Sequence, residues 1–167
     1  MVLRVLAVAA LAWASAAQTP RPAAPTGGRQ ATETKHLTIR TSASAPAAAP
    51  GSAITLYVQI DPRPKMHVYA PEQKDYIPVK LTLASAPAFT SQPARYPKAE
   101  KYFFAPLKET QLVFSKSFRI AQPITLAAGL TDPAVTINGT VRYQACDDAI
   151  CYLPQDVPVT WTIPLKH

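Results

Sequence analysis

Eighteen prolines are the feature of this 167-residue sequence that most restricts its fold, since they are spread along the chain against only five glycines. A proline inside a helix removes a backbone hydrogen bond and clashes with the preceding turn. We therefore exclude a helical bundle and expect strands and loops. With 48% apolar residues, the chain is long enough for one domain with its own core and too short for two.

Much of the sequence after residue 33 alternates apolar and polar residues, which is typical of half-buried strands. MHVYA, residues 66–70, predicts a short strand that carries His67 and Tyr69 on one face. Further strands are predicted for HLTIRTS (36–42), ITLYVQI (54–60), IPVKLTL (77–83), QLVFSKSFRI (111–120), PITLAA (123–128) and VPVTWTIPL (157–165). Seven to nine short strands without a convincing helix predict an all-β fold, an immunoglobulin-like antiparallel β-sandwich of two sheets.

Two stretches depart from simple alternation. In AVTINGTVRYQAC, residues 134–146, the pair Asn138-Gly139 is a hairpin signal, yet the alternation continues through it. We favour one long strand here over two very short ones. Residues 91–109 contain prolines and no sustained alternation, so we expect a long irregular excursion.

The first residues have the pattern of a secretory signal. Arg4 is followed by an apolar run over residues 5–13 and by small residues suited to cleavage, so we assign 1–17 as a signal peptide. The run is shorter than the roughly 20 residues that span a bilayer. QTPRPAAPTGGRQAT, residues 18–32, has almost nothing to bury and is expected to be a disordered leader. The domain is then 33–167, periplasmic or otherwise exported, soluble after cleavage and not membrane-spanning.

Charge does not indicate a nucleic-acid partner. The net charge is +7, but the cations are scattered, without a basic block or interleaved aromatic residues. We therefore expect a solvated surface and no nucleic acid.

The chain has two cysteines, Cys146 and Cys151, in the segment YQACDDAICYLP. They flank the expected loop of an antiparallel hairpin, and three interpretations remain open: a structural disulfide, a redox-active pair, or a metal site. Three histidines give no spacing for a closed zinc site, so we expect no metal and no cofactor. Asp147 and Asp148 lie between the thiols and are expected to raise the thiolate pKa by like-charge repulsion.

The sequence resembles the family of periplasmic N-terminal domains of DsbD thiol:disulfide interchange proteins. The resemblance runs from about Thr34 to Leu165 and rests on ordered landmarks. These are APGSAITLYVQID, MHVYAP, IPVKLTL, the aromatic stretch RYPKAEKYFF and VRYQACDDAICYLP, the last being the most specific. His67 departs from this pattern, because it replaces an aromatic residue.

The resemblance implies a Cys146–Cys151 pair that cycles between disulfide and dithiol. Its electrons would come from a thioredoxin-like donor domain, such as that of a membrane electron conduit, and pass to oxidised periplasmic proteins, including factors of cytochrome c biogenesis. Since full family members also contain the conduit and the donor and this chain ends at residue 167, a separate donor is expected. Cys151 would form the mixed disulfide with the target.

The resemblance also implies roles for the residues around the pair. Tyr102, Phe103 and Phe104 would form a gate over the disulfide, and the pocket would be lined by His67, Tyr69, Asp147 and Asp148. His67 would be a hydrogen-bond donor, a pH-responsive neighbour of the sulfurs, or an ordinary strand histidine. The competing interpretation of the whole domain is a non-catalytic immunoglobulin-like binding module with a structural disulfide.

Overall fold

The computed structural model describes residues 31–166, so the signal peptide and most of the expected leader lie outside the described residues. These residues form strands, turns and loops, with no helix among them and hence no helix that could cross a membrane. Twelve strands occur: β1 (Ala31–Glu33), β2 (Leu37–Ala43), β3 (Ala53–Pro62), β4 (His67–Tyr69), β5 (Lys80–Leu83), β6 (Phe89–Ser91), β7 (Glu100–Phe104), β8 (Glu109–Phe114), β9 (Phe118–Leu126), β10 (Ala134–Tyr143), β11 (Ala145–Cys146) and β12 (Gln155–Pro164).

Two sheets form the body of the molecule. One has the strand order β1-β2-β3-β9-β6 and the other has the order β12-β10-β5, with every strand pair antiparallel. Their apolar faces meet in one core, which contains the alternating residues of β3 (Ile54, Leu56, Val58, Ile60) and of β12 (Val157, Val159, Trp161, Ile163). The predicted immunoglobulin-like antiparallel sandwich is confirmed.

Trp161 ties the two sheets together. Its ring is 2% exposed, and its indole N–H donates to the backbone oxygens of Ser42 on β2 at 3.1 Å and Tyr57 on β3 at 3.3 Å. A buried tryptophan needs such a partner for its polar atom. The largest side chain of β12 therefore fixes how that strand sits on the opposite sheet.

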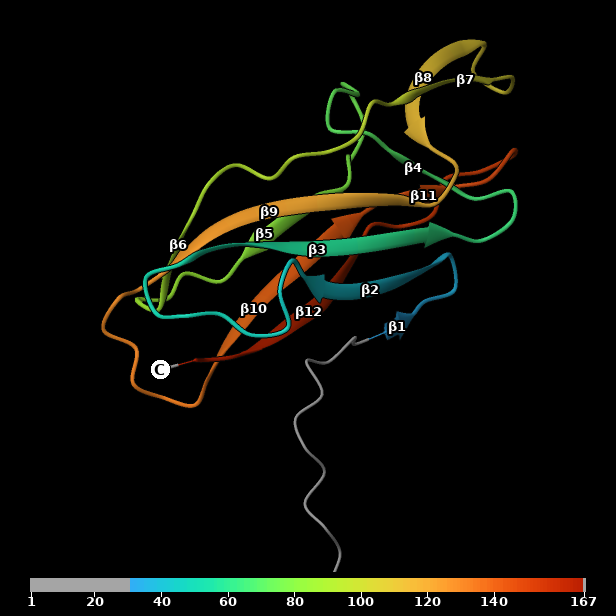
Figure 1. Ribbon diagram of the computed structural model, residues 1–167. Coiled ribbons are helices and arrows are strands. Elements are labelled where there is room, and N and C mark those ends of the chain that lie inside the picture. Colours follow the sequence, from blue (N-terminus) through green and yellow to red (C-terminus); the bar gives the residue numbers. More distant parts are fainter. Residues whose placement is uncertain (1–30, 167) are drawn as a thin grey trace, which may run out of the picture.

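A third sheet lies at one end of the sandwich and carries the cysteines. Its order is β11-β4-β8-β7, and Figure 1 shows the β7–β8 hairpin projecting away from the body. Three of its strands continue strands of the sandwich: β4 follows β3, β8 precedes β9, and β11 follows β10. The strands of the sandwich therefore fix the position of the third sheet.

Three sequence-based expectations are corrected by these strands. Twelve strands in three sheets replace the expected seven to nine in two, because edge strands of three residues, such as β6, are too short to show a period. The expected irregular excursion over 91–109 contains β7, which pairs only with β8 as an edge strand. Strand β1 includes residues 31 and 32, the last two residues of the expected leader.

The Asn138-Gly139 pair does not turn the chain, and the prediction of one long strand is confirmed by β10. Gly139 lies opposite Val159 of β12 on one side and Leu83 of β5 on the other. A Cβ at this position would lie 2.8 Å from the backbone oxygen of Thr82 and 3.1 Å from Leu83 Cδ2. The glycine is needed for the close approach of β5, and its conformational freedom for a turn is not used.

We expect Gly139→Ala to lower the free energy of unfolding by about 1–3 kcal/mol, because the added methyl group meets backbone that cannot move aside. Gly129→Ala is the matched control, since a Cβ there has no atom within 4 Å, and its effect is expected to stay within about 0.5 kcal/mol. Urea unfolding followed by tryptophan fluorescence measures both. Equal stability of the two variants would contradict the close approach at residue 139.

Candidate functional site

Cys146 and Cys151 form a disulfide at the end of the sandwich. Cys146 belongs to β11, where it lies opposite His67 of β4, and it also pairs with Cys151 in a single antiparallel bridge. This pairing places the two α-carbons 4.0 Å apart, with the sulfurs bonded. Cys146 is 0% exposed, whereas Cys151 belongs to the exposed residues. The bridge thus joins an inaccessible cysteine to an accessible one.

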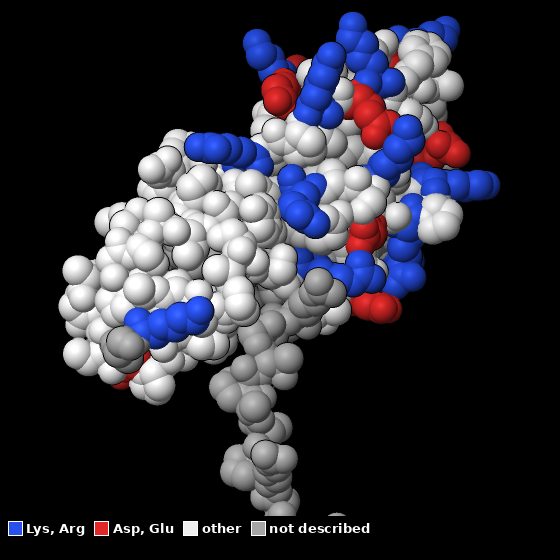
Figure 2. All heavy atoms as spheres, in the orientation of Figure 1, with Lys and Arg blue, Asp and Glu red and all other residues white. Residues whose placement is uncertain are grey.

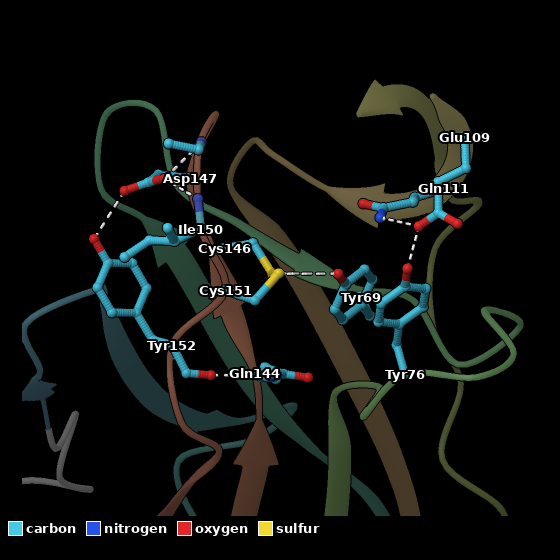
Figure 3. Close-up of a disulfide and its surroundings, with 11 residues drawn as sticks. Tyr69, Tyr76, Glu109, Gln111, Gln144, Cys146, Asp147, Ile150, Cys151 and Tyr152 are labelled. Carbon is cyan, nitrogen blue, oxygen red and sulfur yellow. Dashed lines mark hydrogen bonds between the residues drawn. A yellow bond between two sulfur atoms is a disulfide. The ribbon is translucent and has the colours of Figure 1, made fainter. Parts of the chain in front are cut away.

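The hydroxyl of Tyr69 contacts both sulfurs. It lies 3.2 Å from Cys151 Sγ and 3.3 Å from Cys146 Sγ, as Figure 3 shows for the Tyr69 side chain beside the disulfide. Because a disulfide carries no proton, the tyrosine is the donor in this arrangement. Tyr69 is 0% exposed and packs with Cys146 and Val113 in a small apolar cluster.

A polar group behind Tyr69 was not predicted from the sequence. The ring of Tyr76 stacks on that of Tyr69, with centroids 4.4 Å apart. The Tyr76 hydroxyl donates to Glu109 Oε1, which also accepts from Gln111 Nε2 at 2.6 Å. Burial, together with Tyr76 and Glu109, raises the pKa of Tyr69 to about 12, so its hydroxyl keeps its proton at neutral pH.

Tyr102 is the one residue of the expected gate that the structure brings to the disulfide's neighbours. It packs against the cluster of Tyr69 and Cys146, its ring lies 4.5 Å from that of His67, and its hydroxyl donates to Asp148 Oδ1 at 2.7 Å. Hydrogen bonding to Asp148 raises the pKa of Tyr102. The contact joins the β7–β8 hairpin to the loop between the cysteines.

Phe103 and Phe104 do not belong to the cluster around the cysteines. Successive residues of a strand point to opposite faces, and β7 accordingly leaves Phe103 62% exposed. Phe104 is 4% exposed and does not belong to the cluster around the cysteines. Of the three residues expected to form a gate, Tyr102 alone packs against the cluster of Tyr69 and Cys146.

His67 is buried beside the bridge, 2% exposed, with no hydrogen-bond partner for Nε2. Burial lowers its pKa, and the nearby carboxylates of Asp148 and Asp147 only partly oppose this effect. The imidazole is consequently neutral at pH 7, so the site has no cation from this residue.

Asp147 organises the loop between the cysteines. Its Oδ1 accepts from the backbone N–H groups of Ala149 at 2.8 Å and Ile150 at 2.9 Å, and its Oδ2 accepts from the Tyr152 hydroxyl at 2.8 Å. The same bonds appear in Figure 3. They lower the pKa of the Asp147 carboxyl. The sequence suggested only that this residue adds negative charge, and its structural use was missed.

Sequence patterns did not single out Tyr76, Glu109, Gln111 or Tyr152. One signal was available: Glu109 and Gln111 are two apart at the start of a strand-like run, so they share a face, and a glutamine there interrupts an apolar pattern. Gln111 is 1% exposed. Over residues 31–166, no three His, Cys, Asp or Glu side chains are grouped so that they could hold a metal ion.

A protein-family model matches this chain in sequence. The model of the family described as "Thiol:disulfide interchange protein DsbD, N-terminal" matches residues 35–161. None of the curated proteins matches the chain in sequence.

Solved structures similar to this chain include one ScsB domain and one DsbD domain. The N-terminal periplasmic domain of ScsB from Proteus mirabilis has a TM-score of 0.55 at 10% identity, over 81% of this chain and 51% of that one. The chain thus spans about half of the ScsB structure, and at this identity the likeness supports the fold alone. The DsbD N-terminal domain of Neisseria meningitidis in its reduced form has a TM-score of 0.48 at 17% identity, over 75% of this chain and 89% of that one.

We expect Asp147→Asn to change how stability depends on pH. The pKa of Asp147 lies below its ordinary value of 3.8 in the folded protein, so the carboxylate stabilises the fold above that value, and this contribution disappears as pH falls through the folded pKa. Urea midpoints of the parent and the variant are compared from about pH 6 to about pH 2. The parent is expected to lose stability more steeply. Parallel curves would contradict the role of the carboxylate in the loop.

Proposed function

Because the chain belongs to the family of DsbD N-terminal domains, we propose that it is an exported thiol:disulfide exchange module. In this proposal Cys146 and Cys151 cycle between disulfide and dithiol, which gives the domain a redox role in the reduction of protein disulfides. The observation that carries the proposal is a disulfide at the end of the sandwich that joins a fully buried cysteine to an exposed one.

Because the two cysteines are unequally buried, we assign their sulfurs different roles in the reaction. A partner thiolate can reach Cys151, which is exposed, and the mixed disulfide then forms there. Cys146 is the leaving group, since its side chain is closed off by β4 and by the cluster of Tyr69 and Val113. This order agrees with the role that the family resemblance suggests for Cys151.

The position of the bridge supports reversible opening. Neither cysteine belongs to the main core between the two sheets of the sandwich. The cysteines are five residues apart, and closing so small a loop contributes only about 2 kcal/mol by the chain-entropy expression. Reduction therefore leaves the principal source of stability untouched.

The surface next to Cys151 suits a protein partner. Ile150 is 54% exposed and Leu153 is 85% exposed, so two large apolar side chains flank the accessible cysteine in sequence. In the view of Figure 2, Lys, Arg, Asp and Glu gather over the half of the molecule that includes the third sheet. We assign this end to docking of a thioredoxin-like donor and, in turn, of oxidised acceptor proteins.

Tyr102 is the gate in this proposal. Its contacts with His67 and Asp148 are one ring contact and one exposed hydrogen bond, so a docking partner can replace both. Since Asp148 and Asp147 disfavour a nearby thiolate by charge repulsion, the reduced pair reacts with a docked partner in preference to small oxidants. The ScsB domain is described as periplasmic, and we place this domain in the same kind of compartment.

Single-cysteine variants test the exchange function. Cys146→Ala leaves the exposed Cys151, and Cys151→Ala leaves the buried Cys146 as its matched control. The thioredoxin lacks its resolving cysteine, and its remaining cysteine is first converted to a mixed disulfide with thionitrobenzoate, which leaves when another thiolate attacks. We expect Cys146→Ala to displace thionitrobenzoate and form the protein–protein mixed disulfide at least about tenfold faster than the control, because access governs thiol exchange. Gel electrophoresis without reductant measures the product. Absence of the mixed disulfide in both folded variants would favour the binding module with a structural bridge.

A further inference from the structure

We propose that Tyr69 is a catalytic residue of the exchange reaction, whose hydroxyl donates a hydrogen bond to the Cys146 sulfur as it leaves as a thiolate. The inference rests on the proposed exchange function and adds a chemical role to a residue that sequence reasoning placed only in the pocket lining. Its basis is the position of one hydroxyl within hydrogen-bonding distance of both sulfurs, 3.2 Å from Cys151 and 3.3 Å from Cys146.

The reaction step shows where the donor is needed. The thiolate of a partner dithiol attacks Cys151 Sγ, a new sulfur–sulfur bond forms, and the Cys146–Cys151 bond breaks with its electron pair on Cys146 Sγ. The partner's second thiolate then attacks the partner sulfur of the mixed disulfide, which forms the partner's disulfide and releases Cys151 as a thiolate. The partner is oxidised to a disulfide, and Cys146 and Cys151 become thiols by taking up two protons, lost by the partner dithiol, through solvent.

The thiolate forms on a buried sulfur that has little electrostatic stabilisation apart from Tyr69. Cys146 is 0% exposed, and a buried anion without a partner is costly. The groups that face it are a neutral His67, whose pKa is lowered by burial, and the carboxylates of Asp147 and Asp148 in the adjoining loop. Among residues 31–166, Tyr69 is the only residue whose side chain hydrogen-bonds either sulfur.

The hydroxyl is held in place by contacts that do not depend on the disulfide. Tyr69 is part of β4 and is paired with Val113 of β8, and its ring stacks on that of Tyr76, whose hydroxyl is bound to Glu109. Its pKa of about 12 keeps the proton on the oxygen. Tyr69 therefore stabilises the thiolate by donating a hydrogen bond and does not transfer its proton.

Tyr69→Phe tests the proposal because it removes the hydroxyl and keeps the ring. We expect the rate constant for reduction by dithiothreitol to fall about tenfold to hundredfold, the range of a hydrogen bond to a charged group. Tyr143→Phe is the matched control: Tyr143 is also 0% exposed, but its hydroxyl is hydrogen-bonded to Thr34 and Gln155. This control is expected to react at the parent rate even if it is less stable. Equal rates for all three proteins would overturn the proposal.

A second measurement separates thiolate stabilisation from a structural effect of the substitution. In the Cys151→Ala background the Cys146 thiol titrates alone, and we expect Tyr69→Phe to raise its pKa, because a donor that favours the charged form is lost. Ultraviolet absorbance of the thiolate follows this titration. An unchanged pKa would overturn the role of Tyr69 while leaving the exchange function standing. A parent protein that dithiothreitol cannot reduce while folded would instead overturn the exchange function itself.

Discussion

The site depends on the short antiparallel pairing between β11 and β4. Only two residue pairs make this contact, Ala145 with Val68 and Cys146 with His67. The pairing closes Cys146 off from solvent and places Tyr69, the last residue of β4, beside the sulfurs. Because β4 and β11 continue β3 and β10, the register of the large sheets is carried into the site. A sandwich strand shifted by one residue would turn the cysteine to the other face.

The electrostatics of the site follow from this arrangement. A reactive cysteine is usually activated by a nearby cation or a helix N-terminus, yet His67 is kept neutral by burial and two carboxylates lie in the loop. The support that remains for a developing thiolate is a neutral hydroxyl whose raised pKa keeps its proton in place. Such a pair is slow with small reductants as a disulfide and with small oxidants as a dithiol, and the disulfide gains reactivity when a partner supplies its own activated thiolate.

The sequence predicted more of the fold than of the candidate site. Period-two alternation identified the long strands, as for β3 and β12, because each buries one face against the same core. The short strand at β4 and the region of β8 were also predicted, but β7 was expected to be irregular and β11 to continue β10, so the third sheet was not recognised as a separate sheet. The aromatic triad was taken as one gate, although strand alternation separates Phe103 from Tyr102.

The polar group behind Tyr69 could not be predicted from sequence patterns, for a different reason. Tyr69, Tyr76 and Glu109 meet only because β4, the loop after it and β8 fold together. No local spacing records that meeting. The cysteine segment and the aromatic stretch, by contrast, carried a family resemblance in their local sequence, and the family match over residues 35–161 confirms it.

The most direct test of the account is the reduction potential of the Cys146–Cys151 bridge, measured by equilibration with a thioredoxin couple while near-ultraviolet circular dichroism follows the fold. The account predicts a potential between about −180 and −270 mV, the range of exchanging proteins, with the same spectrum of tertiary structure in both redox states. A potential below about −300 mV, or loss of the native spectrum whenever the bridge opens, would contradict it.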